Sequence, residues 1–141
     1  MNFEKLDIYG FKSFADKVEI KFESGITAIV GPNGCGKSNV ADSIRFVMGE
    51  SSAKSMRGSS MQDVIFNGTD TRKPLQMAEV TLTIDNENHH LQTDVPEIVI
   101  RRRVYRSGES EYYLNGQRCL LKNIKDLFLD TGEGKTAYSI L

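Results

Sequence analysis

Apolar and polar residues alternate with a period of two in several stretches of the chain. The alternation is clear over residues 5–8, 18–22 and 80–84. It places one face of a segment in a core and the other in water, so each stretch is predicted to be a β-strand. Residues 26–30 instead form a nearly continuous apolar, β-branched run, which is typical of a central strand buried on both faces.

A helical period appears in two other places. Apolar residues fall at i, i+4, i+7 and i+8 from Val40, which predicts an amphipathic helix that Gly49 is well placed to end. Leu121, Ile124 and Phe128 lie three to four residues apart and predict a short closing helix.

The second half of the chain is richer in strand signals. Strands are expected at about 98–105 and 111–114, and Asn115-Gly116 favours a tight hairpin because both residues tolerate positive φ. Residues 51–68 are predicted to form a surface loop with a short apolar stretch at 64–66. The pattern as a whole indicates one sheet region around residues 31–38 and one antiparallel meander.

Composition fits a single ordinary globular domain. The chain has 141 residues, with 39% hydrophobic and 26% charged residues. It has no apolar run of 18 residues and no secretory signal, so an intracellular, cytoplasmic protein without a membrane partner is expected. The net charge is −1, so contact with nucleic acid would need a local basic patch. Cys35 and Cys119 are expected to be free thiols.

A glycine-rich segment carries the strongest chemical signal. It fits G-x-x-x-x-G-K-[ST] at every fixed position and stands between the predicted buried strand and the predicted helix. Glycines let successive backbone N–H groups point at phosphate oxygens, and the start of the helix adds positive potential. The lysine supplies a point charge and the serine hydroxyl a Mg²⁺ ligand. The segment is Gly31, Pro32, Asn33, Gly34, Cys35, Gly36, Lys37 and Ser38.

Other motifs of nucleotide hydrolases do not fit. In residues 123–126 the side chains are not in the order of the Asn-Lys-x-Asp motif that recognises guanine. Gly134-Lys135-Thr136 does not complete a second phosphate loop, because the first glycine of that loop would stand at position 129, which is Leu129. The one acidic residue after an apolar stretch is Asp130, but the charges at 122, 125 and 126 favour a helix over a strand there. The sequence therefore predicts a nucleotide-binding site without a convincing set of residues for hydrolysis.

Several further strings, in this order, carry a family resemblance. They are residues 10–14 (GFKSF), 31–39 (GPNGCGKSN), 54–58 (KSMRG), 103–110 (RVYRSGES) and 137–140 (AYSI). Together they resemble the amino-terminal half of the ATPase head of SMC proteins, the bacterial chromosome-condensing kind. The resemblance covers essentially the whole chain.

The resemblance implies an α/β (α+β) fold, namely an ABC-type P-loop NTPase lobe. In this lobe a mixed sheet carries the P-loop helix beside an antiparallel subdomain, and residues 1–141 form one domain. The expected cofactors are ATP and Mg²⁺. The expected partners are the carboxy-terminal half of the same head, a second head in a homodimer, a kleisin-type subunit and double-stranded DNA. The family's glutamine loop should follow residue 140 and the chain ends at Leu141, so a truncated or isolated lobe is expected, nearly inactive without its second half.

The resemblance also assigns roles to single residues. Residues from Pro32 to Asn39 would hold the triphosphate, with Ser38 on the metal. Lys12 resembles a residue that reaches the nucleotide from the side, and Arg57 one that approaches the phosphates like an arginine finger, so Lys37 and Arg57 are the candidate catalytic residues. Asp63 and Val64 resemble the stretch that packs near the base.

Contact with DNA would need clustered basic residues. Arg101 and Arg103 should face one side of their strand and Arg102 the other, so this run does not make one patch. A better cluster is formed by Arg118, Lys122 and Lys125. Two alternatives stay open: the head lobe of another DNA-repair ABC ATPase, Rad50-like or RecN-like, and an interaction module that binds nucleotide or a neighbouring protein without hydrolysis.

Overall fold

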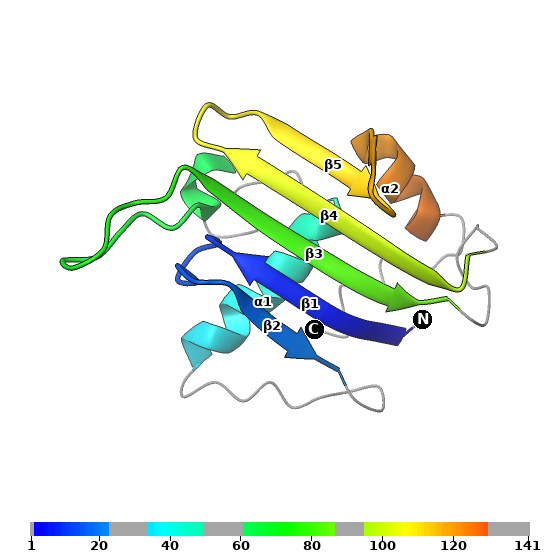
Figure 1. Cartoon of the computed structure of the whole chain (residues 1–141), viewed down its shortest axis with the longest axis horizontal. Helices are drawn as coiled ribbons and strands as arrows, with labels where there is room; N and C mark the ends of the chain where they lie inside the picture. The colour runs from blue at the N-terminus through cyan, green and yellow to red at the C-terminus, as the bar shows by residue number, and fades with distance from the viewer. Residues whose placement is uncertain (1, 23–33, 50–60, 87–94, 130–141) are drawn as a thin grey trace.

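The computed structural model describes residues 2–22, 34–49, 61–86 and 95–129, apart from the side chains of residues 2, 34–38, 128 and 129. The chain order of the elements in these ranges is shown in Figure 1. They are β1 (Asn2–Tyr9), β2 (Val18–Lys21), α1 (Gly34–Val47), the 3₁₀ helix η2 (Met61–Val64), β3 (Met77–Asp85), β4 (Glu97–Tyr105), β5 (Ser110–Leu114), β6 (Gln117–Cys119) and α2 (Leu121–Leu129).

All six described strands form one antiparallel sheet in the order β2-β1-β3-β4-β5-β6. The central pair β3–β4 is in register along its whole length, from Met77 opposite Tyr105 to Asp85 opposite Glu97. Asn115 and Gly116, with φ of 49° and 84°, make the tight turn between β5 and β6 that the sequence predicts. The predicted strand at 26–30 lies outside the described residues.

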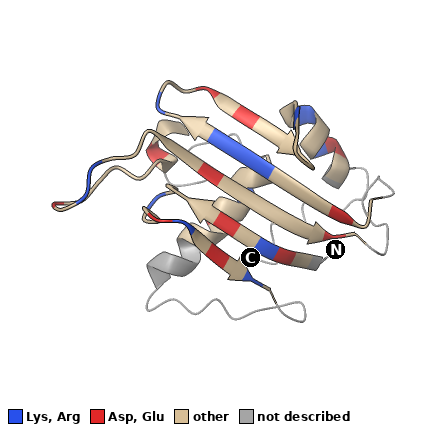
Figure 2. Ribbon diagram, viewed as in Figure 1, with Lys and Arg blue, Asp and Glu red and all other residues tan. Residues whose placement is uncertain are grey.

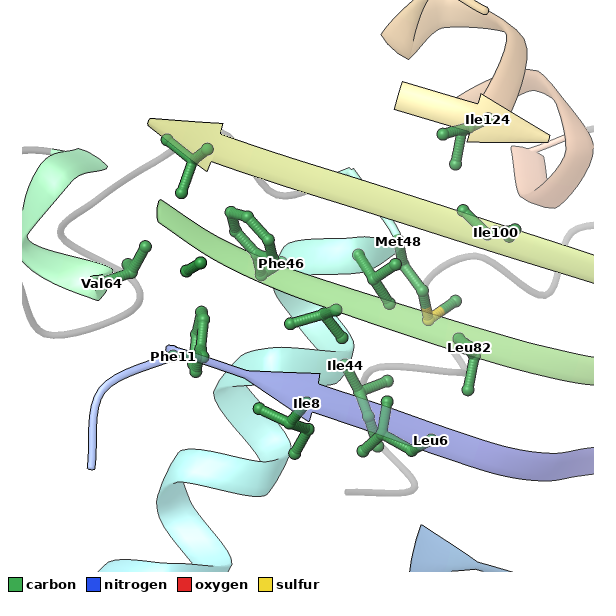
Figure 3. Close-up of a cluster of buried hydrophobic side chains, with 14 of the residues drawn as sticks. Leu6, Ile8, Phe11, Ile44, Phe46, Met48, Val64, Leu82, Ile100 and Ile124 are labelled. Carbon is green, nitrogen blue, oxygen red and sulfur yellow. The ribbon is translucent and has the colours of Figure 1, made fainter. Parts of the chain in front are cut away.

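Helix α1 covers one face of this sheet and creates the core (Figures 1 and 3). Ile44 of α1 and Met48, directly after it, lie against Leu6 and Ile8 of β1 and Leu82 of β3 (Figure 3). Each of these side chains is buried, since every second residue of the strands faces the helix. Ile124 and Leu127 of α2 complete the core beside β4 and β5.

Both predicted helices are confirmed, and one short strand was not predicted. Helix α1 ends at Val47, with Met48 and Gly49 in the following turn, where Gly49 has a φ of 111°. Helix α2 includes Leu127 and Leu129, which agrees with the argument against a strand before Asp130, itself outside the described residues. The short strand β6 was not predicted, because three residues are too few to show a period.

The three consecutive arginines of β4 divide between the two faces of the sheet, as predicted. Arg102 is only 2% exposed, and its guanidinium lies over the rings of Phe46 and Tyr112. Arg101 and Arg103 project from the opposite face, over the ring of Tyr113. Figure 2 shows Lys, Arg, Asp and Glu spread over β1, β3, β4 and β5. This second face is polar, since Arg103 on it pairs there with Glu79 of β3 and Glu111 of β5.

Candidate nucleotide-binding site

Helix α1 begins at Gly34, inside the glycine-rich motif. The helix expected after Lys37 is confirmed, but it starts three residues before Lys37, so the end of the motif is helical and not part of a loop. The first turn of α1 carries no acidic residue, so its partial positive charge is not neutralised from within the helix. Gly31, Pro32 and Asn33 lie outside the described residues, and the side chains of residues 34–38, which include Cys35, Lys37 and Ser38, are not described.

The turn after β1 is held in an unusual backbone conformation. Lys12 has a φ of 53°, the left-handed region that non-glycine residues rarely adopt. Its N–H donates to the carbonyl of Val64 at 2.6 Å, and the N–H of Phe66 donates to the carbonyl of Gly10 at 2.7 Å. The segment 64–66 therefore fixes the backbone on both sides of Phe11 and sets where the Lys12 side chain starts.

The Lys12 side chain reaches α1. Its Nζ lies 3.2 Å from Oδ2 of Asp42, and the two side chains are 15% and 3% exposed. Oδ1 of Asp42 accepts a hydrogen bond from Arg45 at 3.3 Å. One helical turn earlier, the amide of Asn39 donates to Oγ of Ser13 at 2.8 Å. The turn at 10–16 is thus attached to the middle of α1 at two positions one helical turn apart.

These contacts bring three of the predicted site residues together. Lys12, Asn39 and Val64 come from three separate segments and meet beside α1. Val64 is completely buried and takes part through its carbonyl, whereas Asp63 is exposed on η2. Arg57 lies outside the described residues.

Sequence reasoning missed two residues that hold this region. Asp42 pairs with Lys12, thirty positions away in the chain, and no local pattern could indicate that pairing. Arg106 donates to the carbonyls of Leu75 and Phe66 at 2.8 and 3.1 Å, so it ties the turn after β4 to the segment that supports Lys12. The sequence signal that could have identified Arg106 is its place in the string at 103–110.

The predicted basic cluster lies at the end of the sheet, on β6 and α2. Lys122 and Lys125 are exposed on α2, one turn apart. Arg118 of β6 is 66% exposed and lies 3.5 Å from a carboxylate oxygen of Glu111. Part of its charge is therefore balanced within the sheet.

None of the helices in the described part of the chain is long and apolar enough to span a bilayer.

Comparisons with known proteins define the class. The chain matches the family model for the RecF/RecN/SMC N terminal domain over residues 2–136. It belongs to this family, whose members include nucleotide-binding heads of the kind that the motif and the fold indicate. Two structures of the recombination mediator protein RecF with nucleotide, both 23% identical, have the same fold, with TM-scores of 0.62 and 0.65 over 84% and 86% of this chain and 28% and 29% of those chains.

Within the family, the chain is similar to bacterial Smc proteins along its whole length. The chain is 57% identical over 141 residues to the chromosome partition protein Smc of Bacillus subtilis (strain 168), which covers all of this chain and 12% of that protein. A structure from work on ATP-driven dimerization and DNA-stimulated activation of SMC ATPases matches with a TM-score of 0.87 and 40% identity, over 100% of this chain and 92% of that one. An Smc head bound to the C-winged helix domain of ScpA matches with a TM-score of 0.86 and 47% identity, over 93% and 41%.

These matches confirm the predicted fold class, an ABC-type P-loop head lobe, and the predicted resemblance to SMC heads. The chain spans about an eighth of the length of the curated relatives it matches, 12% in each of those most similar to it.

Proposed function

We propose that this chain is the ATP-binding lobe of an SMC-type head, which binds ATP with Mg²⁺ through residues 31–39. The observation that carries the proposal is the start of α1 inside the glycine-rich motif, with the Lys12 turn attached beside it. A helix amino terminus within such a motif favours bound phosphate. The Lys12 ammonium, which is paired with Asp42, brings a further cation to the side of the same helix.

Each predicted site residue has a role in this proposal. The backbone of residues 32–36 surrounds the phosphates, Lys37 contacts the β- and γ-phosphates, and Ser38 ligates Mg²⁺. Lys12 and Asn39 lie at the side of this site, and Arg57 stabilises charge on the phosphates during transfer. Val64 supports the Lys12 turn through its backbone, and Asp63, exposed beside it, is assigned to the region near the base.

Hydrolysis is proposed for the completed head. The carboxy-terminal half would add the acidic residue that orients water, and a second head would close over the nucleotide. The similar proteins support this assignment: one matched structure concerns ATP-driven dimerization and DNA-stimulated activation, and another is bound to ScpA. By similarity, we assign this chain a homodimeric head, a kleisin-type subunit and double-stranded DNA as partners, in chromosome partition.

The cellular place follows from this assignment. A protein that acts in chromosome partition works in the cytoplasm, at the nucleoid, and curated relatives named for that process match along the whole chain. Residues 1–141 form a single lobe, and a coiled coil, a hinge and the second half of the head belong to other parts of such a protein.

Calorimetric titration with ATP tests the proposal. The wild-type chain is expected to bind ATP when Mg²⁺ is present, and Lys37→Ala to bind it at least about tenfold more weakly, the loss of one charge-assisted contact. Adenosine serves as the control ligand, because it lacks phosphates and its binding should not respond to Lys37. Equal affinities of the wild type and Lys37→Ala for ATP would contradict the proposal.

A further inference from the structure

A buried carboxylate lies near the middle of α1. The Asp42 side chain is 3% exposed, and its two oxygens face different cations, Lys12 on Oδ2 and Arg45 on Oδ1. Burying such charges costs free energy that the pairing recovers only in part, and a well-packed apolar residue is often at least as stabilising. Stability therefore gives little reason for this arrangement, and a positioning role explains it better.

The place of Asp42 on the helix relates it to the phosphate loop. It follows Ser38 by four residues, so the two lie on the same side of α1, about 6 Å apart along the axis. Asn39, which follows the motif directly, holds Ser13 of the Lys12 turn. The ammonium of Lys12 is consequently fixed beside the middle of α1, about one helical turn after Ser38.

The two ends of Lys12 are held by different means. Its backbone is fixed by the hydrogen bond from its N–H to the Val64 carbonyl and by its left-handed conformation, both of which are independent of its charge. Its side chain is directed by the carboxylate of Asp42 at 3.2 Å. Removal of the Asp42 charge should release the ammonium and leave the fold of the turn in place.

We infer that Asp42 is a positioning residue for ATP binding: it holds the Lys12 ammonium where that cation can act on the phosphates of a nucleotide at the motif. Arg45 keeps the second oxygen of Asp42 paired, so the carboxylate stays compensated when Lys12 moves toward a phosphate. This inference rests on the proposed function and adds to it the residue that orients the side cation.

A double-mutant cycle on the whole chain tests this inference, with ATP–Mg²⁺ and AMP as ligands in calorimetry. Lys12→Met and Asp42→Asn are each expected to raise the Kd for ATP about tenfold, the size of one charge-assisted contact. The double variant is expected to match Lys12→Met, because both changes remove the same contact. The Kd for AMP, which lacks the outer phosphates, should change little.

Two further variants distinguish a positioning role of Asp42 from a general effect on the folded structure. Asp42→Glu keeps the charge and is expected to recover part of the lost affinity. Asp16→Asn is the matched control, because it removes another carboxylate of the same turn, paired with Arg72 and 75% exposed, without touching Lys12. Thermal unfolding and circular dichroism show that each variant is folded.

The outcomes distinguish the two levels of the proposal. Additive losses for Lys12→Met and Asp42→Asn, or equal losses for Asp42→Asn and Asp16→Asn, would overturn the role of Asp42 while ATP binding by the motif stands. If Asp42→Asn does not fold, the affinity of Asp42→Glu decides, and a loss equal to that of Lys12→Met would count against positioning. A wild-type chain that binds no ATP, or binds as Lys37→Ala does, would overturn the proposed function itself.

Discussion

At the scale of single residues, two glycines adopt positive φ for different reasons. Gly10 has a φ of 67° and is buried next to the Lys12 turn, whereas Gly116 has a φ of 84° in the exposed β5–β6 turn. A Cβ on Gly10 would lie 2.5 Å from the carbonyl oxygen of Met77, but a Cβ on Gly116 would meet no atom within 4 Å. A residue with a side chain would strain the backbone at both positions, and at Gly10 its Cβ would also clash with the Met77 carbonyl oxygen.

The matched pair Gly10→Ala and Gly116→Ala separates these effects. Gly116→Ala is expected to cost about 1 kcal/mol, the penalty of a left-handed backbone for an L-residue. Gly10→Ala adds a clash with backbone on β3 and is expected to cost about 3 kcal/mol in total. Urea denaturation measures both. Equal losses of unfolding free energy for the two variants would show that Met77 moves aside without cost.

Residue chemistry could be read from the sequence only where the signal was local. The turn residues Asn115 and Gly116 and the alternating faces of Arg101 to Arg103 were predicted, because each depends on neighbours in the chain. Which face of β4 is buried could not be predicted, since a charged residue is rarely placed in a core. The role of Asp42 could not be predicted either, because it is a buried charged residue and its partner Lys12 is distant in sequence.

At the scale of elements, Arg102 joins β4 to the end of α1. Its NH1 donates to the carbonyl of Phe46 at 2.9 Å, and its guanidinium centre lies 4.3 Å from the centre of the Phe46 ring. The same carbonyl accepts from the N–H of Gly49, so the end of α1 is closed by backbone and side chain together. A buried arginine in this position fixes the helix along its axis.

Arg102→Ala is expected to lower the free energy of unfolding by about 2–4 kcal/mol, because it leaves a cavity and removes a buried hydrogen bond. Arg102→Met fills most of the volume and should cost less. Arg101→Ala, on the opposite face of the same strand, is the control and should cost less than about 1 kcal/mol. Urea denaturation of the three variants provides the comparison, and a loss for Arg101→Ala as large as for Arg102→Ala would refute the assignment.

The polar face of the sheet contains a connected charge network. Arg103 donates to Glu79 at 2.6 Å and to the hydroxyl of Tyr105 at 3.3 Å, and this hydroxyl donates to Glu111 at 2.7 Å. The hydrogen bond from Tyr105 is the main cause that lowers the pKa of Glu111, opposed by partial desolvation and helped by Tyr113 and by nearby arginines. The ionised form of Glu111 is therefore favoured in the folded chain.

A lowered pKa in the folded state makes stability depend on pH in one direction. The contribution of Glu111 is fully present above the ordinary glutamate pKa of 4.5 and is lost as the pH falls below it toward the folded value. The unfolding free energies of the wild type and Glu111→Gln should therefore differ at pH 7 and converge on acidification. Glu109→Gln, in the exposed turn before β5, is the control, and a constant difference across the pH range would contradict the network.

Elements were easier to predict than their arrangement. Periods of two and 3.6 residues identified the long strands and both helices, because each buries one face against the same core. That β1 and β2 join the meander in one sheet depends on the pairing of Leu6 with Leu82 and of Ile8 with Val80, which are contacts between distant segments. No period along the chain contains that information.

At the scale of the molecule, the chain combines a sheet covered on one face with the proposed nucleotide site at the start of its covering helix. The site residues that the structure brings together, Lys12, Asn39 and Asp42, contribute positive charge, an amide and a carboxylate already paired with two cations. A carboxylate paired in this way is poorly suited to act as a base toward water. The arrangement favours binding, and the hydrolytic base is expected from the carboxy-terminal half of the head.

This division leads to a prediction about turnover. The chain mixed or joined with the carboxy-terminal half of an SMC-type head should release phosphate from ATP at least about 100-fold faster than the chain by itself, because a positioned general base contributes about that much or more. Lys37→Ala in the same mixture should return the rate to that of the chain, since the nucleotide would no longer be held. Phosphate release under single-turnover conditions separates chemistry from binding. Rapid turnover by the chain without the second half would mean that a base lies within residues 1–141, and the division of labour between two halves would then be wrong.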